Sequence, residues 1–168
     1  YCLIQLEIPQ PTVRAALSLS KSQGVFNILD PAPCRRLPKS LLRLVDIITP
    51  NEFELAELTG MPVKTKRNIE CAGEKLFQTG VGEVIVTCGE RGVCHLSSDG
   101  ANWFSAPKVN AIDTVGAGDC FNGSLASALS SDLGMAEAIR FAVSTSAHAV
   151  TIRGVQSSFP ELKPSNCY

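Results

Sequence analysis

The sequence lacks the features that mark several common protein classes. It has no run of 18 apolar residues, and its start, YCLIQLEIPQ, has no charged segment followed by an apolar stretch, so we expect neither a membrane span nor a signal peptide. It has no basic stripe interleaved with aromatic residues, so nucleic acid is not an expected partner. The 168 residues are 45% hydrophobic and carry a formal net charge of −1. This balance is typical of a soluble globular protein, and we expect a cytoplasmic one.

Paired cysteines are also missing, although the chain has seven cysteines. No C-x-x-C pair occurs and the spacing is irregular, which argues against both a disulfide framework and a zinc site. Only His95 and His148 would add imidazole ligands. We therefore expect reduced thiols and no metal held by soft ligands.

Strand-like and helix-like patterns alternate along the chain. Apolar runs predict strands at residues 2–8, 25–29, 44–49 and 83–87, and a hairpin-like pair at 92–98 and 102–107. Helical spacing of apolar residues and terminal glycines predict helices at 12–24, 50–60 and 67–79, and two more in the last third. Such alternation is typical of right-handed crossovers. We predict an α/β fold with a mostly parallel sheet and helices on both faces, in one continuous domain over residues 1–168.

Three polar segments follow predicted extended stretches. TPNEFE follows the strand that ends near Ile48, TCGERG follows EVIV, and DTVGAGD follows the short stretch KVNAI. Ligands of open α/β sheets bind beyond the carboxyl ends of the strands. We therefore expect the ligand site at these three segments.

The segment DTVGAGD is suited to binding an anion. Gly116, Ala117 and Gly118 leave their backbone N–H groups unshielded, and a helix starting there adds the positive end of its dipole. Asp119 would lie at the mouth of this site, where a carboxylate accepts a hydroxyl proton as a phosphoryl group arrives. Glycine-rich loops before helices are common, however, and Asp is a favoured N-cap residue, so these residues alone leave an ordinary helix cap open.

Two other phosphate-binding motifs do not occur. The chain has no G-x-x-x-x-G-K-[ST] loop, and no G-x-G-x-x-G fingerprint follows its opening strand. Their absence argues against a P-loop protein and against a dinucleotide-dependent dehydrogenase.

DTVGAGDCFNG closely resembles the C-terminal signature of the ribokinase-type carbohydrate kinases, also called the phosphofructokinase-B family. The pattern D-T-x-G-A-G-D is matched without departure, and TPNEFE and TCGERG fit the N-x-x-E and T-x-G-x-x-G motifs of that family in the right order. QLEIP, DPAP and AVTIRGVQSS resemble ribokinase-type segments in particular. The resemblance covers essentially the whole chain, aligned to the C-terminal part of the family.

The resemblance implies ATP-dependent phosphorylation of the primary hydroxyl of a sugar, with D-ribose favoured. Asp119 would be the general base, and Gly116, Ala117 and Gly118 would form the anion hole. Glu7 would bind sugar hydroxyls, although by itself it is an ordinary acid at a strand end. A kinase of the same family for fructose, 2-keto-3-deoxygluconate, a nucleoside or a sugar phosphate is one alternative. A non-catalytic nucleotide-binding module is another.

ATP, Mg²⁺ and K⁺ would complete the implied site. Glu54 would hold Mg²⁺ largely through water, since this cation keeps much of its water shell, and a solvated carboxylate on a helix face is the alternative. Val143 would lie against the adenine, although a core valine explains it nearly as well. The other implied nucleotide contacts are Asn51, Thr87, Cys88, Gly89, Glu90, Arg91, Gly92 and Gly118. The implied K⁺ ligands, several through backbone carbonyls, are Asp113, Val115, Ala149, Ile152, Gly154 and Ser158.

Other parts of the family pattern do not appear in this sequence. Family members carry an N-terminal half with a small β-sheet lid, a sugar-contacting aspartate and a Gly-Gly motif. We therefore expect the 168 residues alone to be weakly active or inactive. We also expect the full-length protein to form a homodimer through the lid, as is common in the family.

Overall fold

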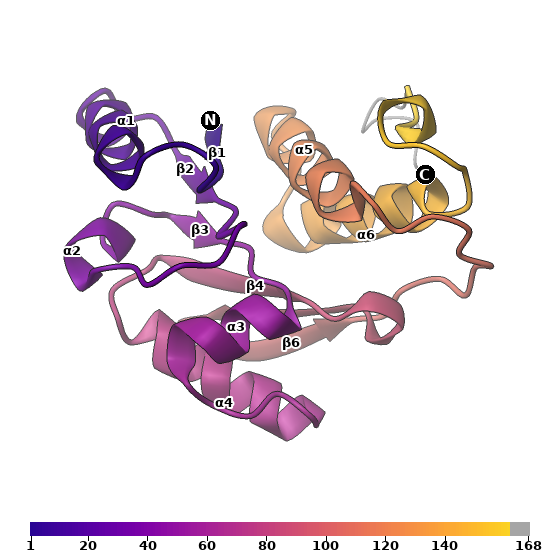
Figure 1. The fold of residues 1–168 in the computed structure, drawn as a ribbon, viewed down its shortest axis with the longest axis horizontal. Coiled ribbons are helices and arrows are strands. Elements are labelled where there is room, and N and C mark those ends of the chain that lie inside the picture. The colour runs from indigo at the N-terminus through magenta and orange to yellow at the C-terminus, as the bar shows by residue number, and fades with distance from the viewer. Residues whose placement is uncertain (162–168) are drawn as a thin grey trace. The chain divides into compact units, whose positions relative to one another are not determined.

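The six strands within residues 1–161 lie in the sheet in the same order as along the chain. A computed structural model describes residues 1–161 and gives the sheet order β1-β2-β3-β4-β5-β6 (Figure 1). β1 to β4 pair in parallel. Only short connections precede β5 and β6, and these fit antiparallel neighbours, because a parallel crossover takes roughly a dozen residues or more. The predicted α/β fold with a mostly parallel sheet is confirmed. The strands are β1 (Cys2–Ile4), β2 (Asn27–Leu29), β3 (Ile47–Ile48), β4 (Glu83–Thr87), β5 (Val93–Ser97) and β6 (Gly100–Phe104).

Local sequence explains where several helices begin and end. In α3, Asn51 and Glu54 form a capping box, and Gly60 ends the helix in the left-handed conformation. The Thr65 hydroxyl accepts a hydrogen bond from a backbone N–H in the first turn of α4. No helix within residues 1–161 is long and apolar enough to cross a lipid bilayer. The helices are α1 (Gln10–Ser22), α2 (Lys39–Leu42), α3 (Glu52–Thr59), α4 (Lys66–Phe77), α5 (Ala117–Ser130) and α6 (Met135–Ala149), with short 3₁₀ helices η1 (Gly89–Arg91) and η2 (Gln156–Ser158).

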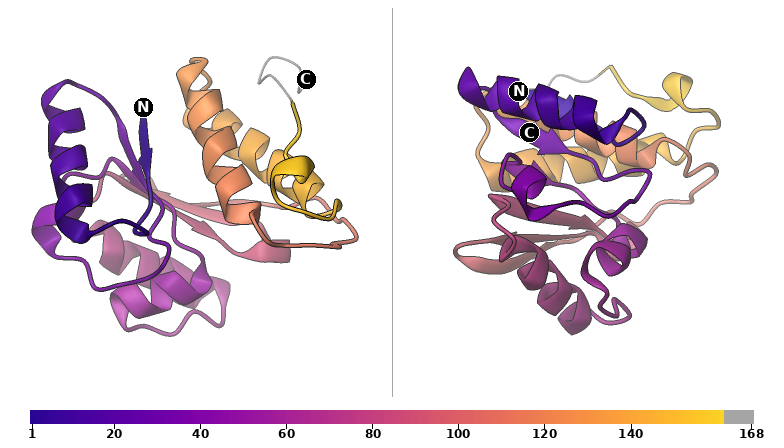
Figure 2. Two further views of the ribbon diagram at one scale, coloured as in Figure 1. Left: turned by 45° about the horizontal axis from the view of Figure 1, so that its top comes forward. Right: turned by 60° about the vertical axis from the view of Figure 1, so that its left-hand side comes forward.

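The chain divides into two compact units. One consists of Tyr1–Cys88 and Cys94–Trp103, and the other of Gly89–Val93 and the chain from Phe104 onward. In the first unit, α1 to α4 share one apolar core with the strands. In the second unit, α5 and α6 pack side by side (Figure 2). The prediction of one continuous domain stays a prediction.

Some predicted elements are shorter in the structure or are not formed. β1 ends at Ile4 rather than residue 8, because the chain turns there and the backbone N–H of Leu6 donates to the carbonyl of Ala32. Residues 108–112, predicted to be extended, lie outside every described strand. α2 was not predicted, since its four residues are too few to show a helical period.

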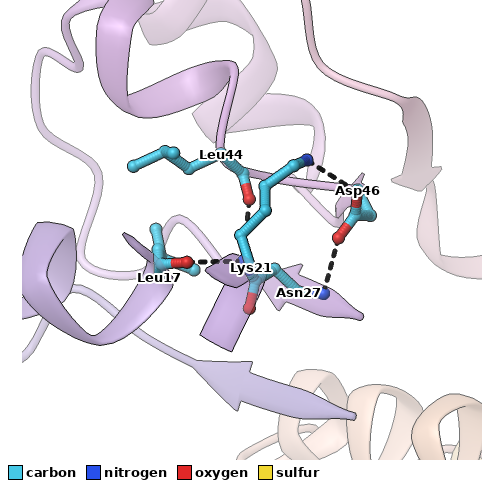
Figure 3. A network of polar contacts seen from close by, with 5 residues as sticks. All are labelled: Leu17, Lys21, Asn27, Leu44 and Asp46. Carbon is cyan, nitrogen blue, oxygen red and sulfur yellow. Dashed lines mark hydrogen bonds and ion pairs between the residues drawn. The ribbon is translucent and has the colours of Figure 1, made fainter. Parts of the chain in front are cut away.

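A polar network that is buried at Asn27 and exposed at Lys21 connects the amino ends of β2 and β3 to α1 (Figure 3). The fully buried Asn27 donates from Nδ2 to the carbonyls of Leu17 (2.9 Å) and Leu44 (2.8 Å). Asp46 accepts from the backbone N–H of Asn27 at 2.8 Å and pairs with Lys21 at 3.0 Å. This network lies at the opposite ends of the strands from the polar segments that follow them.

Candidate active site

Two of the predicted motifs meet at the carboxyl ends of β3 and β4. Asn51 forms an isolated parallel bridge with Thr87, and the backbone N–H of Thr87 donates to the carbonyl of Pro50 at 3.0 Å. The first residue of the N-x-x-E motif therefore lies beside the first residue of TCGERG. The expectation that both segments follow strands is confirmed.

Glu54 is held in a defined position in the first turn of α3. Its Oε2 accepts from the backbone N–H of Asn51 at 2.8 Å, and Asn51 Oδ1 accepts from the N–H of Glu54 at 2.9 Å. Glu54 is only 7% exposed, so the alternative of a solvated carboxylate on a helix face is wrong. Burial raises the pKa of Glu54, the N–H of Asn51 lowers it, and the charge of Asp30 raises it further.

A buried carboxylate with one oxygen engaged fits a hydrated cation. The capping bond uses Oε2 of Glu54, which leaves Oε1 to accept from water molecules around Mg²⁺. Nearby positive charge would also offset the burial that raises the pKa of Glu54. Among the described residues there is no group of three or more His, Cys, Asp or Glu placed to hold a metal ion. A water-mediated site at Glu54 and Asn51 does not require one.

The segment after β4 forms the 3₁₀ helix η1 between two glycines with positive φ. Gly89 has φ 54° and open space where a Cβ would stand, whereas Gly92 has φ 89° and a Cβ there would lie 1.9 Å from the carbonyl oxygen of Phe104. Gly92 is therefore required for backbone packing. Glu90 and Arg91 are exposed. Cys88 is 3% exposed, so its side chain faces the interior.

The DTVGAGD loop leads directly into α5. Gly116 is the N-cap residue with φ 79°, and the N–H of Cys120 donates to its carbonyl at 2.9 Å. Asp119 is an exposed residue of the first helical turn and is not the N-cap, so the reading of Asp119 as an ordinary cap is wrong. Ala117 and Gly118 are the first two helical residues, and the N–H of Ala117 makes a long bond of 3.3 Å to the carbonyl of Thr114. A 14-residue helix thus begins with small residues and a carboxylate at its positive end.

Asp113 joins the loop before α5 to the segment after α6. Its Oδ1 accepts from the N–H of Val115 and its Oδ2 from the N–H of Gly154, both at 3.1 Å. The N–H groups of Ile112 and Asp113 both donate to the carbonyl of Val150, at 2.7 and 3.1 Å. The bonds from Gly154 and then Val115 lower the pKa of Asp113. Three of the six implied K⁺ ligands therefore lie in one hydrogen-bonded group.

The other implied K⁺ ligands lie on the same stretch of chain. Ala149 ends α6, and its carbonyl accepts from the N–H of Ile152 at 3.1 Å. Ser158 is buried in η2, and its hydroxyl donates to the carbonyl of Val155 at 2.7 Å. The carbonyl of Ala149 and the hydroxyl of Ser158 offer oxygen atoms, which are the ligands that a hard monovalent cation requires. K⁺ binding stays a prediction.

The remaining predicted contacts differ in accessibility. Glu7 is exposed just beyond β1. Val143 on α6 is 6% exposed, as a core valine would be, and its contact with adenine stays a prediction. The sequence analysis did not single out Asp30, which directly follows β2 and whose Oδ2 accepts from Gln5 Nε2 at 3.0 Å. The DPAP segment follows a strand just as TPNEFE does, so the same rule would have found it.

Comparison with known proteins identifies the family of the chain. Residues 2–162 match the model of the pfkB family of carbohydrate kinases, and the chain belongs to that family. It is 36% identical over 167 residues to a ribokinase of Staphylococcus aureus, covering 99% of this chain and 55% of that protein. It is 39% identical over 167 residues to a deoxyribokinase of Salmonella typhimurium, with the same coverage.

A solved structure shows the same fold. The structure of Arabidopsis thaliana ribokinase complexed with ribose and ATP matches with a TM-score of 0.90 at 33% identity, covering 97% of this chain and 53% of that one. The chain thus spans about half the length of the relatives that it matches.

Proposed function

We propose that the full-length protein transfers the γ-phosphoryl group of ATP to the primary hydroxyl of a sugar, with D-ribose as the favoured acceptor. The observation that carries this proposal is the start of α5, where the small residues 116–118 are followed by the exposed carboxylate of Asp119. A helix N-terminus attracts the transferring phosphoryl group, and a carboxylate beside it accepts the proton of the attacking hydroxyl. Family membership supports the same reaction.

In this proposal Asp119 is the general base and the loop before it is the anion hole. The proton of the sugar hydroxyl passes to a carboxylate oxygen of Asp119 as the oxygen attacks phosphorus, and the β-phosphate oxygen leaves with ADP. Backbone N–H groups of residues 116–118 stabilise the charge on the phosphoryl oxygens. Glu7 binds sugar hydroxyls.

The nucleotide and both ions would bind at residues already described. The segment from Thr87 to Gly92 contacts the nucleotide, beside Asn51, with Gly118 and Val143 as further contacts. Glu54 would hold Mg²⁺ through water, and Mg²⁺ would offset charge on the phosphates. K⁺ would bind at the oxygens around Asp113 and Gly154, where it supports the anion-hole loop. Dimerisation and the low activity of the 168 residues alone stay predictions.

A second acceptor is 2-deoxyribose, because a deoxyribokinase is as similar to this chain as a ribokinase is. Sugar-dependent ADP release by the full-length protein would test the proposal, with ribose, 2-deoxyribose and fructose, with and without K⁺. Turnover with ribose supports it, and turnover with 2-deoxyribose alone keeps the reaction but changes the substrate. No turnover with any sugar would refute it.

Asp119→Asn tests the role of the base. We expect this variant to lose turnover by about 10²–10⁴-fold, the usual contribution of a general base, while ATP binding measured by calorimetry stays nearly unchanged. Asp132→Asn is the matched control, because Asp132 is exposed and lies just beyond the other end of α5. Wild-type turnover by Asp119→Asn would show that another group takes the proton.

A further inference from the structure

Asp30 lies where the carboxyl ends of β1 and β2 meet. It directly follows β2 and is only 6% exposed. Its Oδ2 accepts from Gln5 Nε2 at 3.0 Å, and its backbone N–H donates to the carbonyl of Ile4 at 2.9 Å. The carboxylate of Asp30, at the end of the neighbouring strand, therefore fixes Gln5, the first residue after β1.

The same strand end is held at the next residue as well. The N–H of Leu6 donates to the carbonyl of Ala32 at 2.8 Å, and the Leu6 side chain is fully buried in the core of the first unit. Glu7, which follows at once, is exposed. The backbone that presents Glu7 thus depends on contacts with residues 30–32, whereas the Glu7 side chain projects toward solvent.

Asp30 is also close to the N-x-x-E motif. Its charge is near enough to Glu54 to raise the pKa of that carboxyl. Asp30 therefore bonds to the residue that follows β1 and lies near the helix turn that carries Glu54. A buried carboxylate is costly unless it is hydrogen-bonded, so the presence of Asp30 at this point fits a positioning role better than a packing role.

We propose that Asp30 is a positioning residue for sugar binding: through Gln5 it fixes the short segment that presents Glu7 to the acceptor sugar. The proposal rests on the sugar-kinase function proposed above, with Glu7 as a sugar contact. Asp30 itself need not touch the sugar. A carboxylate that orients another binding group changes the affinity for the sugar more than it changes the chemical step.

Three variants of the full-length protein separate this role from general stability. Asp30→Ala removes the acceptor, and Gln5→Met removes the donor while keeping a side chain of similar length. Asp30→Asn keeps an oxygen that accepts from Gln5 but removes the charge. The matched control is Asp46→Ala, because Asp46 likewise accepts a side-chain hydrogen bond, from Lys21, and lies at the opposite ends of the strands (Figure 3).

Steady-state kinetics with ribose, or with the acceptor found for the wild type, at saturating Mg²⁺ is the test. We expect Asp30→Ala to raise KM for the sugar about tenfold, the effect of losing one net hydrogen bond of about 1.4 kcal/mol, with KM for ATP and kcat within about twofold. Gln5→Met should raise the same KM in the same direction, and Asp30→Asn and Asp46→Ala should keep wild-type values. If Asp30→Ala does not fold, Gln5→Met alone decides.

The outcomes distinguish this inference from the proposed function. Wild-type protein without turnover on any sugar would refute the sugar-kinase function itself. Active wild type with an unchanged sugar KM in Gln5→Met and Asp30→Ala would overturn the role of Asp30 alone. An equal rise in sugar KM in Asp46→Ala, or in Asp30→Asn, would also overturn it, because the effect would then come from lost stability or lost charge.

Discussion

Gly89 and Gly92 lie at the two ends of the segment that contains η1, so replacement of each by alanine can be compared directly. Both have positive φ, which costs a residue with a Cβ roughly 1–2 kcal/mol. At Gly89 the added Cβ meets open space, so Gly89→Ala should lower the free energy of unfolding by about 1–2 kcal/mol and no more.

At Gly92 the same substitution meets backbone. The Cβ would lie 1.9 Å from the carbonyl oxygen of Phe104 and 2.9 Å from the backbone nitrogen of Ala106, so η1 and the chain after β6 must move apart. Forced overpacking typically costs about 1–3 kcal/mol in addition to the backbone strain. We expect Gly92→Ala to lower the free energy of unfolding by about 2–5 kcal/mol in total.

Urea unfolding of both full-length variants, followed by far-ultraviolet circular dichroism, measures the difference. The midpoint should fall further for Gly92→Ala, with an unchanged slope against urea concentration. Equal midpoints for the two variants would refute the assignment of Gly92 to backbone packing. The presence of Gly92 in the T-x-G-x-x-G motif would then reflect contact with the nucleotide alone.

Two further predictions concern ionisable groups. Burial raises the pKa of the Cys88 and Cys94 thiols to about 12. At pH 8 both thiols should therefore react with iodoacetamide far more slowly than the half-buried Cys71, and mass spectrometry of the labelled peptides measures these rates. Labelling of Cys88 at the rate of Cys71 would contradict this. The pKa of Asp113 is lowered in the folded state, so its bonds stabilise the protein above the ordinary pKa and this contribution is lost as pH falls through the lowered value. Asp113→Asn should therefore have a lower free energy of unfolding than wild type at pH 7, and the difference should disappear in strong acid, as urea unfolding at several pH values would show. A difference that is independent of pH would show that the charge of Asp113 plays no part.

Strands and helices that depend on residues close together in the sequence were predicted well. The run EVIVT is β4, and α3 lies within residues 50–60, where the spacing of apolar residues and the terminal Gly60 predicted a short helix. The signature DTVGAGDCFNG begins α5. In each of these, the atoms that decide the structure are within a few residues of one another, so a short window of sequence contains the cause.

Contacts between distant residues were not predictable in this way. Asp113 bonds to Gly154, 41 residues away, and Gln5 bonds to Asp30, 25 residues away. The early end of β1 has the same origin, because Leu6 pairs with Ala32 instead of extending the strand. No local pattern identifies the distant group to which each of these carboxylates bonds, and cysteine reactivity likewise depends on burial by distant residues. Cys167, the seventh predicted thiol, lies outside the described residues.

The identical order of the strands in the sheet and along the chain affects how the protein is made. Each of β2 to β4 pairs with the strand that precedes it, so the partner of each new strand has already left the ribosome when that strand emerges. Loop-closure costs stay small because every pairing spans only a crossover of one or two helices or a short connection. The sheet can therefore assemble by successive addition at one edge during synthesis. A pause in translation at the point where α4 has just left the ribosome should leave β1 to β3 paired and resistant to protease.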